Sequence, residues 1–172
     1  MKKYPESIGP DDLPDSQTSA TENETMTDMQ ELADIEALKT VMAKYARFGD
    51  SQNWTEFRKL FTDDLVYSAE AAPRPNADAP QAARIEGLDT FIGGMSELLV
   101  GAHTSHQMFL PEIIVIDATR AKSTWGLHDL VKTPNSIFNG FGHIHQEYVK
   151  IDGEWKITRS HTSRLFVEEQ FL

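Results

Sequence analysis

Four long β-prone segments fill the second half of the chain, and their length constrains the fold more than any other feature of the sequence. Each segment is rich in Ile, Val, Thr, Trp, Tyr and Phe, and together they cover residues 106–117, 122–133, 138–151 and 155–167. Turn residues separate them, and the Asp152-Gly153 pair is typical of a type I′ hairpin turn. Strands of this length have to bend around other material, so we expect a curved, antiparallel or mixed sheet.

The first half of the chain supplies that material as amphipathic helices. Apolar residues at three- and four-residue spacing predict a helix that begins near Thr27 or Asp28 and ends with Gly49 as its C-cap. Further helices are predicted over residues 54–61 and 87–99, with a short strand at 65–69 and a proline-broken loop at 71–84. The predicted class is therefore α+β: a cone-shaped α+β barrel whose curved sheet wraps around three N-terminal helices.

The N-terminal stretch has a different composition. The chain carries a formal net charge of −11, and residues 1–30 hold seven acidic and two basic residues. This stretch has too few aliphatic residues to offset the entropy of ordering it. We predict a disordered acidic tail over residues 1–28 and one folded domain over residues 29–172. No apolar stretch follows Lys2 and Lys3, so we predict no signal peptide and expect a cytoplasmic protein.

The composition argues against several classes of function. The absence of cysteine removes disulfide frameworks, thiolate nucleophiles and cysteine-ligated zinc. The negative net charge disfavours nucleic acid as a partner, and no apolar run approaches the roughly 20 residues of a membrane-spanning helix. No glycine-rich phosphate loop, serine nucleophile elbow or dinucleotide fingerprint is present. Histidine, carboxylate and phenol remain as the available catalytic groups.

Two polar residues stand at the end of the first predicted helix. Tyr45 lies on its apolar stripe, and Asp50 follows directly after Gly49. A spacing of five residues brings the two side chains together only if the helix unwinds around Gly49. Without that unwinding, Tyr45 is a core aromatic residue and Asp50 a turn residue.

A second group of polar residues belongs to the β-rich half. His106 stands near the start of the first long strand, and a histidine base needs a carboxylate to orient it, for which Asp50 and Asp129 are both candidates. Asp129 ends an apolar alternation, which places its carboxylate on the inner face of the sheet. A buried acid requires a partner. Arg164 is either that partner or an anchor for a substrate anion.

His143 and His145 suggest a competing hypothesis. Residues two apart on a strand share a face, so these two imidazoles could bind the metal ion of an oxygenase, with His161 or Glu147 as a third ligand. The helix-rich first half of the chain does not suit the double-stranded β-helix of such oxygenases. We therefore predict no metal site.

Three segments carry a resemblance to a known family. They are DIEALKTVMAKYARFGD at residues 34–50, TSHQMFLPEI at 104–113 and EYVKIDGEWKI at 147–157. Together with the order of the predicted elements, they resemble the SnoaL-like branch of the nuclear transport factor 2-like superfamily. Within it the chain looks most similar to the bile acid 7α-dehydratases, and more distantly similar to scytalone dehydratase and lindane dehydrochlorinase.

The resemblance implies a cofactor-free lyase of dehydratase type. The catalytic tyrosine, aspartate and histidine of the family fall on Tyr45, Asp50 and His106, and a further acid and arginine fall on Asp129 and Arg164. The expected substrate is a hydrophobic alicyclic or aromatic small molecule. Its predicted binding surface consists of Phe57, Phe61, Met95, Met108, Trp125, Phe138 and Phe141.

Alternatives to this function remain open. The same residues suit a lyase that cleaves a carbon–carbon bond and releases formaldehyde, or an isomerase acting on an aromatic substrate. A non-catalytic small-molecule-binding module is also compatible, since a fold does not imply a function. In each case the outer face of a curved open sheet leads us to expect a homodimer or homotrimer.

Overall fold

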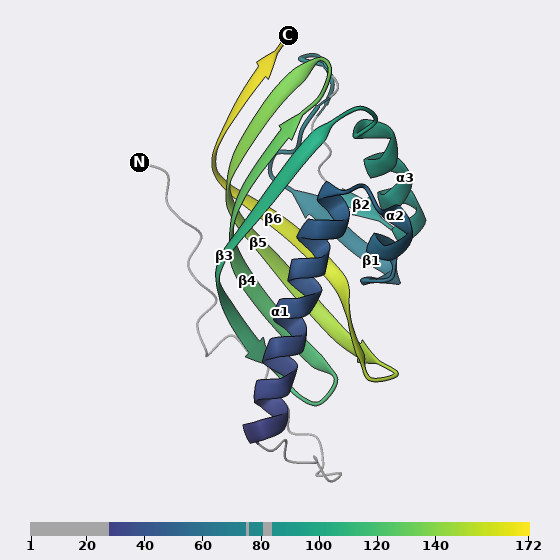
Figure 1. The fold of residues 1–172 in the computed structure, drawn as a ribbon, viewed down its shortest axis with the longest axis vertical. Helices are drawn as coiled ribbons and strands as arrows, with labels where there is room; N and C mark the ends of the chain where they lie inside the picture. Colours follow the sequence, from purple (N-terminus) through teal and green to yellow (C-terminus); the bar gives the residue numbers. More distant parts are fainter. Residues whose placement is uncertain (1–27, 75, 81–83) are drawn as a thin grey trace.

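The computed structural model describes residues 28–74, 76–80 and 84–172, in which a six-stranded sheet curves around three helices (Figure 1). The predicted acidic tail lies outside the described residues except for Asp28, which begins the first helix. The helices are α1 (Asp28–Asp50), α2 (Trp54–Arg58) and α3 (Leu88–Leu98). The strands are β1 (Phe61–Ala69), β2 (Arg84–Glu86), β3 (His103–Val115), β4 (Arg120–Lys132), β5 (Ser136–Ile151) and β6 (Glu154–Phe171).

The strands lie in the order β2-β1-β6-β5-β4-β3. β1 and β6 run parallel, and all other neighbouring pairs are antiparallel. In Figure 1, α1 lies along the concave side of the sheet, with α2 and α3 beside one end of it. The predicted α+β class, with a curved mixed sheet around three N-terminal helices, is confirmed.

The core forms where α1 meets the inner face of the sheet. Leu38 and Met42 of α1 are fully buried, and every second residue of β4 from Ala121 to Val131 is buried as well. This alternation is the pattern expected of a strand with one covered face. Asp129 is the charged member of that buried row, as the sequence predicted.

The first turns of α1 are attached to the sheet by a buried carboxylate. Asp34 accepts hydrogen bonds from Lys150 Nζ at 2.5 Å and from Trp155 Nε1 at 2.9 Å. Burial alone would raise the pKa of Asp34, but these hydrogen bonds outweigh burial and the pKa is lowered. These two hydrogen bonds hold α1 against the hairpin between β5 and β6. That hairpin has positive φ at both Asp152 (51°) and Gly153 (81°), which confirms the predicted type I′ turn.

The boundary predicted at Gly49 is wrong. α1 continues through Asp50, and the left-handed backbone conformation falls on Gln52, with φ of 52°. Gly49 is instead buried inside the helix, where an added Cβ would lie 3.6 Å from the ring of Phe57. The glycine therefore serves close packing rather than helix termination.

Two further boundaries differ from the prediction. α2 ends at Arg58, and Phe61 begins β1 rather than completing the helix. The short strand β2, which pairs with β1, was not predicted at all. Its three residues offer too little alternation to be recognised in the sequence. Among the described residues, no helix is both long enough and apolar enough to cross a membrane.

Candidate active site

Asp50, the last residue of α1, and His106 of β3 form a hydrogen-bonded pair. His106 Nδ1 lies 2.6 Å from Asp50 Oδ1, and the backbone N–H of His106 donates to Asp50 Oδ2 at 2.9 Å. Thr104 Oγ1 donates to Asp50 Oδ1 at 2.8 Å. Of the two carboxylates that the sequence offered for orienting His106, Asp50 therefore fills that place.

The turn after α1 determines this arrangement. Gln52, in its left-handed conformation, donates from Nε2 to the carbonyl oxygens of Leu99 at 3.1 Å and Ala102 at 3.0 Å. Ala102 directly precedes β3, and His106 is the fourth residue of that strand. The end of α1 is thereby attached to the start of the histidine strand. No unwinding of the helix is needed, contrary to the condition derived from the spacing of Tyr45 and Asp50.

The hydrogen bond to Asp50 determines which nitrogen of the imidazole carries the hydrogen. Burial alone would raise the pKa of the Asp50 carboxyl, but hydrogen bonds from His106 and Thr104 and the charge of His106 lower it. Asp50 is therefore an acceptor at neutral pH, and Nδ1 of His106 carries the proton. Nε2 is left as the nitrogen that can accept a proton from a bound molecule.

Tyr45 lies beside this pair, with its ring edge-on to His106 at a centroid distance of 6.4 Å. It also packs against Phe57 and Phe61. Burial, followed by the neighbouring Tyr67 and the charge of Asp129, raises the pKa of Tyr45 well above its usual value. The phenol therefore keeps its proton at neutral pH and is suited to donating a hydrogen bond.

Asp129 of β4 and Arg164 of β6 form a second pair, across the intervening strand β5. Arg164 donates from Nη1 to Oδ1 at 2.5 Å and from Nη2 to Oδ2 at 2.9 Å, a bidentate arrangement. Both side chains are more than nine-tenths buried. The predicted partnership of Asp129 and Arg164 is confirmed. Because the charge of Arg164 is already compensated, the pair does not leave a free cation for a substrate anion.

A glycine makes room for this pair. A Cβ on Gly140 would lie 2.5 Å from both Arg164 Nη1 and Asp129 Oδ1, and 2.7 Å from the ring of Phe138. These separations are far below van der Waals contact. Gly142, two residues along, would clash with the carbonyl oxygen of Ser163. Glycine is therefore required at positions 140 and 142, where any side chain would clash with its neighbours.

These groups border one cavity of about 80 Å³. Its polar groups come from Tyr45, Tyr67, His106, Asp129, Thr162 and Arg164. The rest of the wall is largely apolar and comes from α1, α2, α3 and the inner face of the sheet, including Trp54, Phe57, Phe91, Met95, Leu98, Leu127 and Ile144. The cavity therefore combines a base, a phenol and a charged pair with an apolar surround.

Several predicted binding residues lie elsewhere. Met108 and Trp125 border a separate hollow of about 310 Å³ on the other side of His106. Phe61 is buried behind Tyr45 and Phe91, outside the cavity wall. Phe141 points to the convex face of the sheet, where it stacks between His128 and Phe166. It belongs to the opposite face because it lies an odd number of residues from Ile144, whose side chain faces inward.

All six histidines fall within the described residues, and only His106 is on the concave face. The other five follow the alternation of their strands onto the convex face, at positions 103, 128, 143, 145 and 161. There His145 bonds Thr124 and Ser163 and stacks on His161 at 5.8 Å. Within the described part of the chain, no group of three or more His, Asp or Glu residues is placed to hold a metal ion.

Sequence reasoning missed Tyr67. It lies on β1 between the buried residues Leu65 and Ala69, borders the cavity and has a pKa raised by burial. The alternation Leu65, Tyr67, Ala69 in the predicted strand was the available signal, since it assigns all three side chains to the inner face.

The chain belongs to the SnoaL-like domain family, whose model matches residues 30–161. This match confirms the broader of the two resemblances drawn from the sequence. The narrower resemblance, to the bile acid 7α-dehydratases, stays a prediction.

Solved structures share this fold at low sequence identity. A scytalone dehydratase-like protein from Novosphingobium aromaticivorans superimposes with a TM-score of 0.72 at 19% identity, covering 85% of this chain and 93% of its own. A type 2 hexachlorocyclohexane dehydrochlorinase gives 0.70 at 14% identity, with coverages of 84% and 93%. The type 3 enzyme from Novosphingobium barchaimii gives 0.68 at 13% identity, with coverages of 84% and 94%.

Proposed function

We propose that this protein is a cofactor-free lyase that removes water from a hydrophobic alicyclic or aromatic small molecule. The observation that carries the proposal is the Asp50–His106 pair, with Nδ1 bound to the carboxylate and the imidazole bordering an apolar cavity. The dehydratase and dehydrochlorinase names of the structural neighbours agree with elimination chemistry. The proposed assignment of roles is Asp50 for orientation, His106 for the base and Tyr45 for the hydrogen-bond donor.

In the proposed reaction, Nε2 of His106 takes a proton from a carbon next to the carbon that bears a hydroxyl group. The electrons of the C–H bond form the new double bond, and the C–O bond breaks. Asp50 stabilises the imidazolium that results. Tyr45 donates a hydrogen bond to the departing oxygen, which takes the proton from Nε2 of His106 and leaves as water, so that the base is regenerated. The raised pKa of Tyr45 favours this donor role over a lasting phenolate.

Asp129 and Arg164 would position the substrate rather than react with it. Their charges cancel in the bidentate pair, so they present hydrogen-bonding groups to a polar substituent without attracting an anion. A neutral ring carrying hydroxyl or carbonyl groups matches the mixture of apolar wall and paired charges.

The test is turnover of a panel of cyclic β-hydroxy ketones, followed by mass spectrometry. Loss of water supports dehydration, whereas release of formaldehyde with a shorter carbon skeleton identifies carbon–carbon cleavage. We expect His106→Ala and Asp50→Asn each to lower turnover by about 100- to 10,000-fold. His103→Ala, on the same strand but facing outward, is the matched control and retains activity. Full activity in both site variants contradicts the proposal, and ligand binding without turnover identifies a binding module.

We also propose that the protein forms a homodimer or homotrimer through the convex face of the sheet. Leu130 and Phe166 are 39% and 53% exposed there, and the ring stack of His128, Phe141 and Phe166 runs across three strands. Apolar surface of this kind is commonly covered by another subunit. Light scattering coupled to size-exclusion chromatography tests this, and Phe166→Asp should shift the mass toward the monomer. A monomeric wild-type protein would contradict it.

A further inference from the structure

Five residues that follow β1 form part of the cavity wall. We call residues 70–74 the strap, because they continue from the end of β1 and contribute Ala72 and Pro73 to the cavity lining. The near end of the strap is attached to β6: Glu70 accepts from the backbone N–H of Arg164 at 2.7 Å, and the Ala71 carbonyl accepts from Arg164 Nε at 3.0 Å. The strap therefore touches the same arginine that pairs with Asp129.

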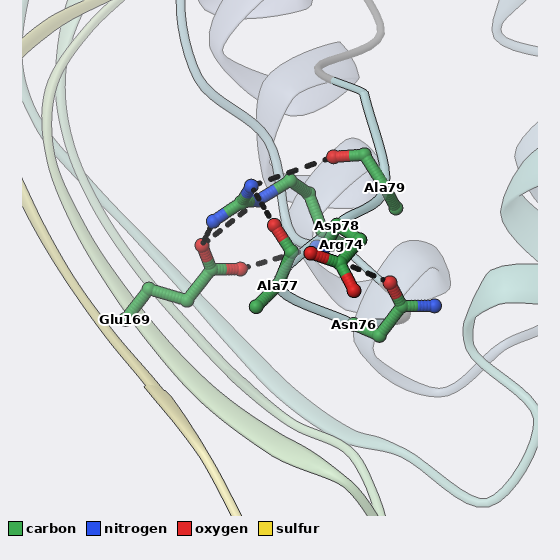
Figure 2. Close-up of polar contacts among 6 residues, drawn as sticks. All are labelled: Arg74, Asn76, Ala77, Asp78, Ala79 and Glu169. Atoms are coloured by element: carbon green, nitrogen blue, oxygen red, sulfur yellow. Dashed lines mark hydrogen bonds and ion pairs between the residues drawn. The ribbon is translucent and has the colours of Figure 1, made fainter.

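The far end of the strap is held by one arginine. Arg74 donates to Glu169 from Nη2 at 2.6 Å and from Nε at 3.0 Å, and its backbone N–H reaches the same carboxylate at 3.3 Å. Arg74 Nη1 also donates to the carbonyls of Ala77 and Ala79, at 2.9 and 3.4 Å (Figure 2). The Glu169 side chain is only 10% exposed. The contact is therefore a sheltered, bidentate pair rather than a loose surface pair.

A register shift in β6 puts Glu169 where Arg74 can reach it. Gly142 pairs with Arg164, but its neighbour Phe141 pairs with Phe166, so Leu165 is an extra residue in β6. As a result Glu169 pairs with the inward-facing Phe138, although it lies five residues beyond the inward-facing Arg164. Without the extra residue, Glu169 would face the convex side of the sheet.

The cavity under the strap is too small for the proposed kind of substrate. It measures about 80 Å³, whereas a cavity known to hold benzene measures about 150 Å³. A ring-bearing molecule enters only if part of the wall moves. The strap is an element of this wall that belongs to neither a helix nor a strand, and among the residues that the structure describes the Arg74–Glu169 pair attaches its far end to the sheet.

We propose that the Arg74–Glu169 pair determines the size of substrate that the site admits, by holding the strap against the cavity. This inference rests on the proposed function only in calling the admitted molecule a substrate. The control of access to the cavity does not depend on it. When the pair separates, Ala72 and Pro73 move outward and the cavity opens to larger rings. Arg74 and Glu169 are thus positioning residues that act on specificity without touching the reacting atoms.

The first test measures access without any turnover. Trp54 lines the cavity, so acrylamide quenching of its fluorescence reports how open the cavity is. Subtracting the signal of the matching Trp54→Phe protein removes the contributions of the two other tryptophans. We expect Arg74→Ala and Glu169→Gln each to raise the quenching constant of Trp54 at least threefold, and the exchanged pair Arg74→Glu with Glu169→Arg to restore much of the protection. Arg120→Ala, which removes an ion pair in the β3–β4 turn, is the matched control and should change nothing.

The second test measures ligand size with phenol and 2-naphthol as probes. In Arg74→Ala and Glu169→Gln, the affinity for 2-naphthol should rise at least fivefold, while the affinity for phenol changes less than twofold. Unchanged Trp54 quenching and unchanged selectivity in both variants would overturn the inference. Circular dichroism checks the fold, and the nearly isosteric Glu169→Gln carries the comparison if Arg74→Ala does not fold. Neither measurement depends on catalysis, so absence of lyase activity would refute the proposed function and leave this inference standing.

Discussion

Replacing Gly140 by alanine should disrupt the Asp129–Arg164 pair at the centre of the candidate site. The new methyl group would sit 2.5 Å from one atom of each partner and 2.7 Å from the ring of Phe138. Arg164 has a flexible side chain, whereas Phe138 is 1% exposed and packed in the core, and Asp129, 4% exposed, can move only into the small cavity that it borders. The pair therefore has to separate, because the methyl group occupies the space between its partners.

The expected loss of stability depends on whether the methyl group only overpacks the site or also separates the ion pair. Overpacking alone costs about 1–3 kcal/mol, whereas separating a buried ion pair costs about 3–5 kcal/mol. Because both partners are buried, we expect a loss of about 3 kcal/mol in the free energy of unfolding, at the lower end of the range for a separated ion pair. For a domain of this size the melting temperature should fall by roughly 6–12 °C.

Urea denaturation followed by tryptophan fluorescence measures this loss. Gly93→Ala is the matched control: it lies within α3 with no atom within 4 Å of the added Cβ, so it should stabilise the protein by about 0.5–1 kcal/mol. A loss below about 1 kcal/mol for Gly140→Ala would show that the site absorbs the methyl group, and the reasoning about the pair would be refuted.

Three other substitutions test separate parts of the fold. The pKa of Asp34 is lowered, so its carboxylate stabilises the protein at pH values above the ordinary pKa of 3.8, and this stability is lost as the pH falls through the lowered pKa. Denaturation at a series of pH values should show a smaller acid-induced loss of stability for Asp34→Asn than for the wild type, and equal losses would contradict this. Gln146 is buried, and neither of its side-chain polar atoms has a partner in the described part of the chain, so Gln146→Met should raise the free energy of unfolding by about 1 kcal/mol while the exposed Gln170→Met leaves it unchanged. Gly153 has φ of 81° and open space around it, so Gly153→Ala should cost about 1–2 kcal/mol from backbone strain alone, and a neutral result would argue against the type I′ turn.

The sequence was sufficient wherever a side chain's direction depends on local periodicity. The inward direction of Asp129 and the burial of Leu38, Met42 and Tyr45 in α1 follow from strand and helical periods alone. Leu32, which the same spacing assigns to the buried stripe, is 58% exposed near the start of the helix. The same rule could have corrected one error. Phe138 and Phe141 lie three residues apart on one strand, so they cannot line the same cavity, and Phe141 in fact stacks on the convex face.

The sequence was insufficient where a single residue is inserted into a strand or a turn. Arg164 and Glu169 share the inner face only because Leu165 is an extra residue in β6, and nothing in the local pattern marks it. The left-handed position at Gln52 is similar, since a glycine stands three residues earlier and would be the usual choice. Gln52 is favoured there by its hydrogen bonds to Leu99 and Ala102, which are distant in sequence.

The separation of the histidines has a practical consequence for spectroscopy. Among six imidazoles, only His106 faces inward, and it donates from Nδ1 to a carboxylate. Its Nδ1 proton should therefore give a low-field signal in proton NMR, separated from the signals of the other imidazoles. That signal can be followed without assigning the rest of the spectrum. Ligands can then be screened by displacement of one resonance, before any substrate has been identified.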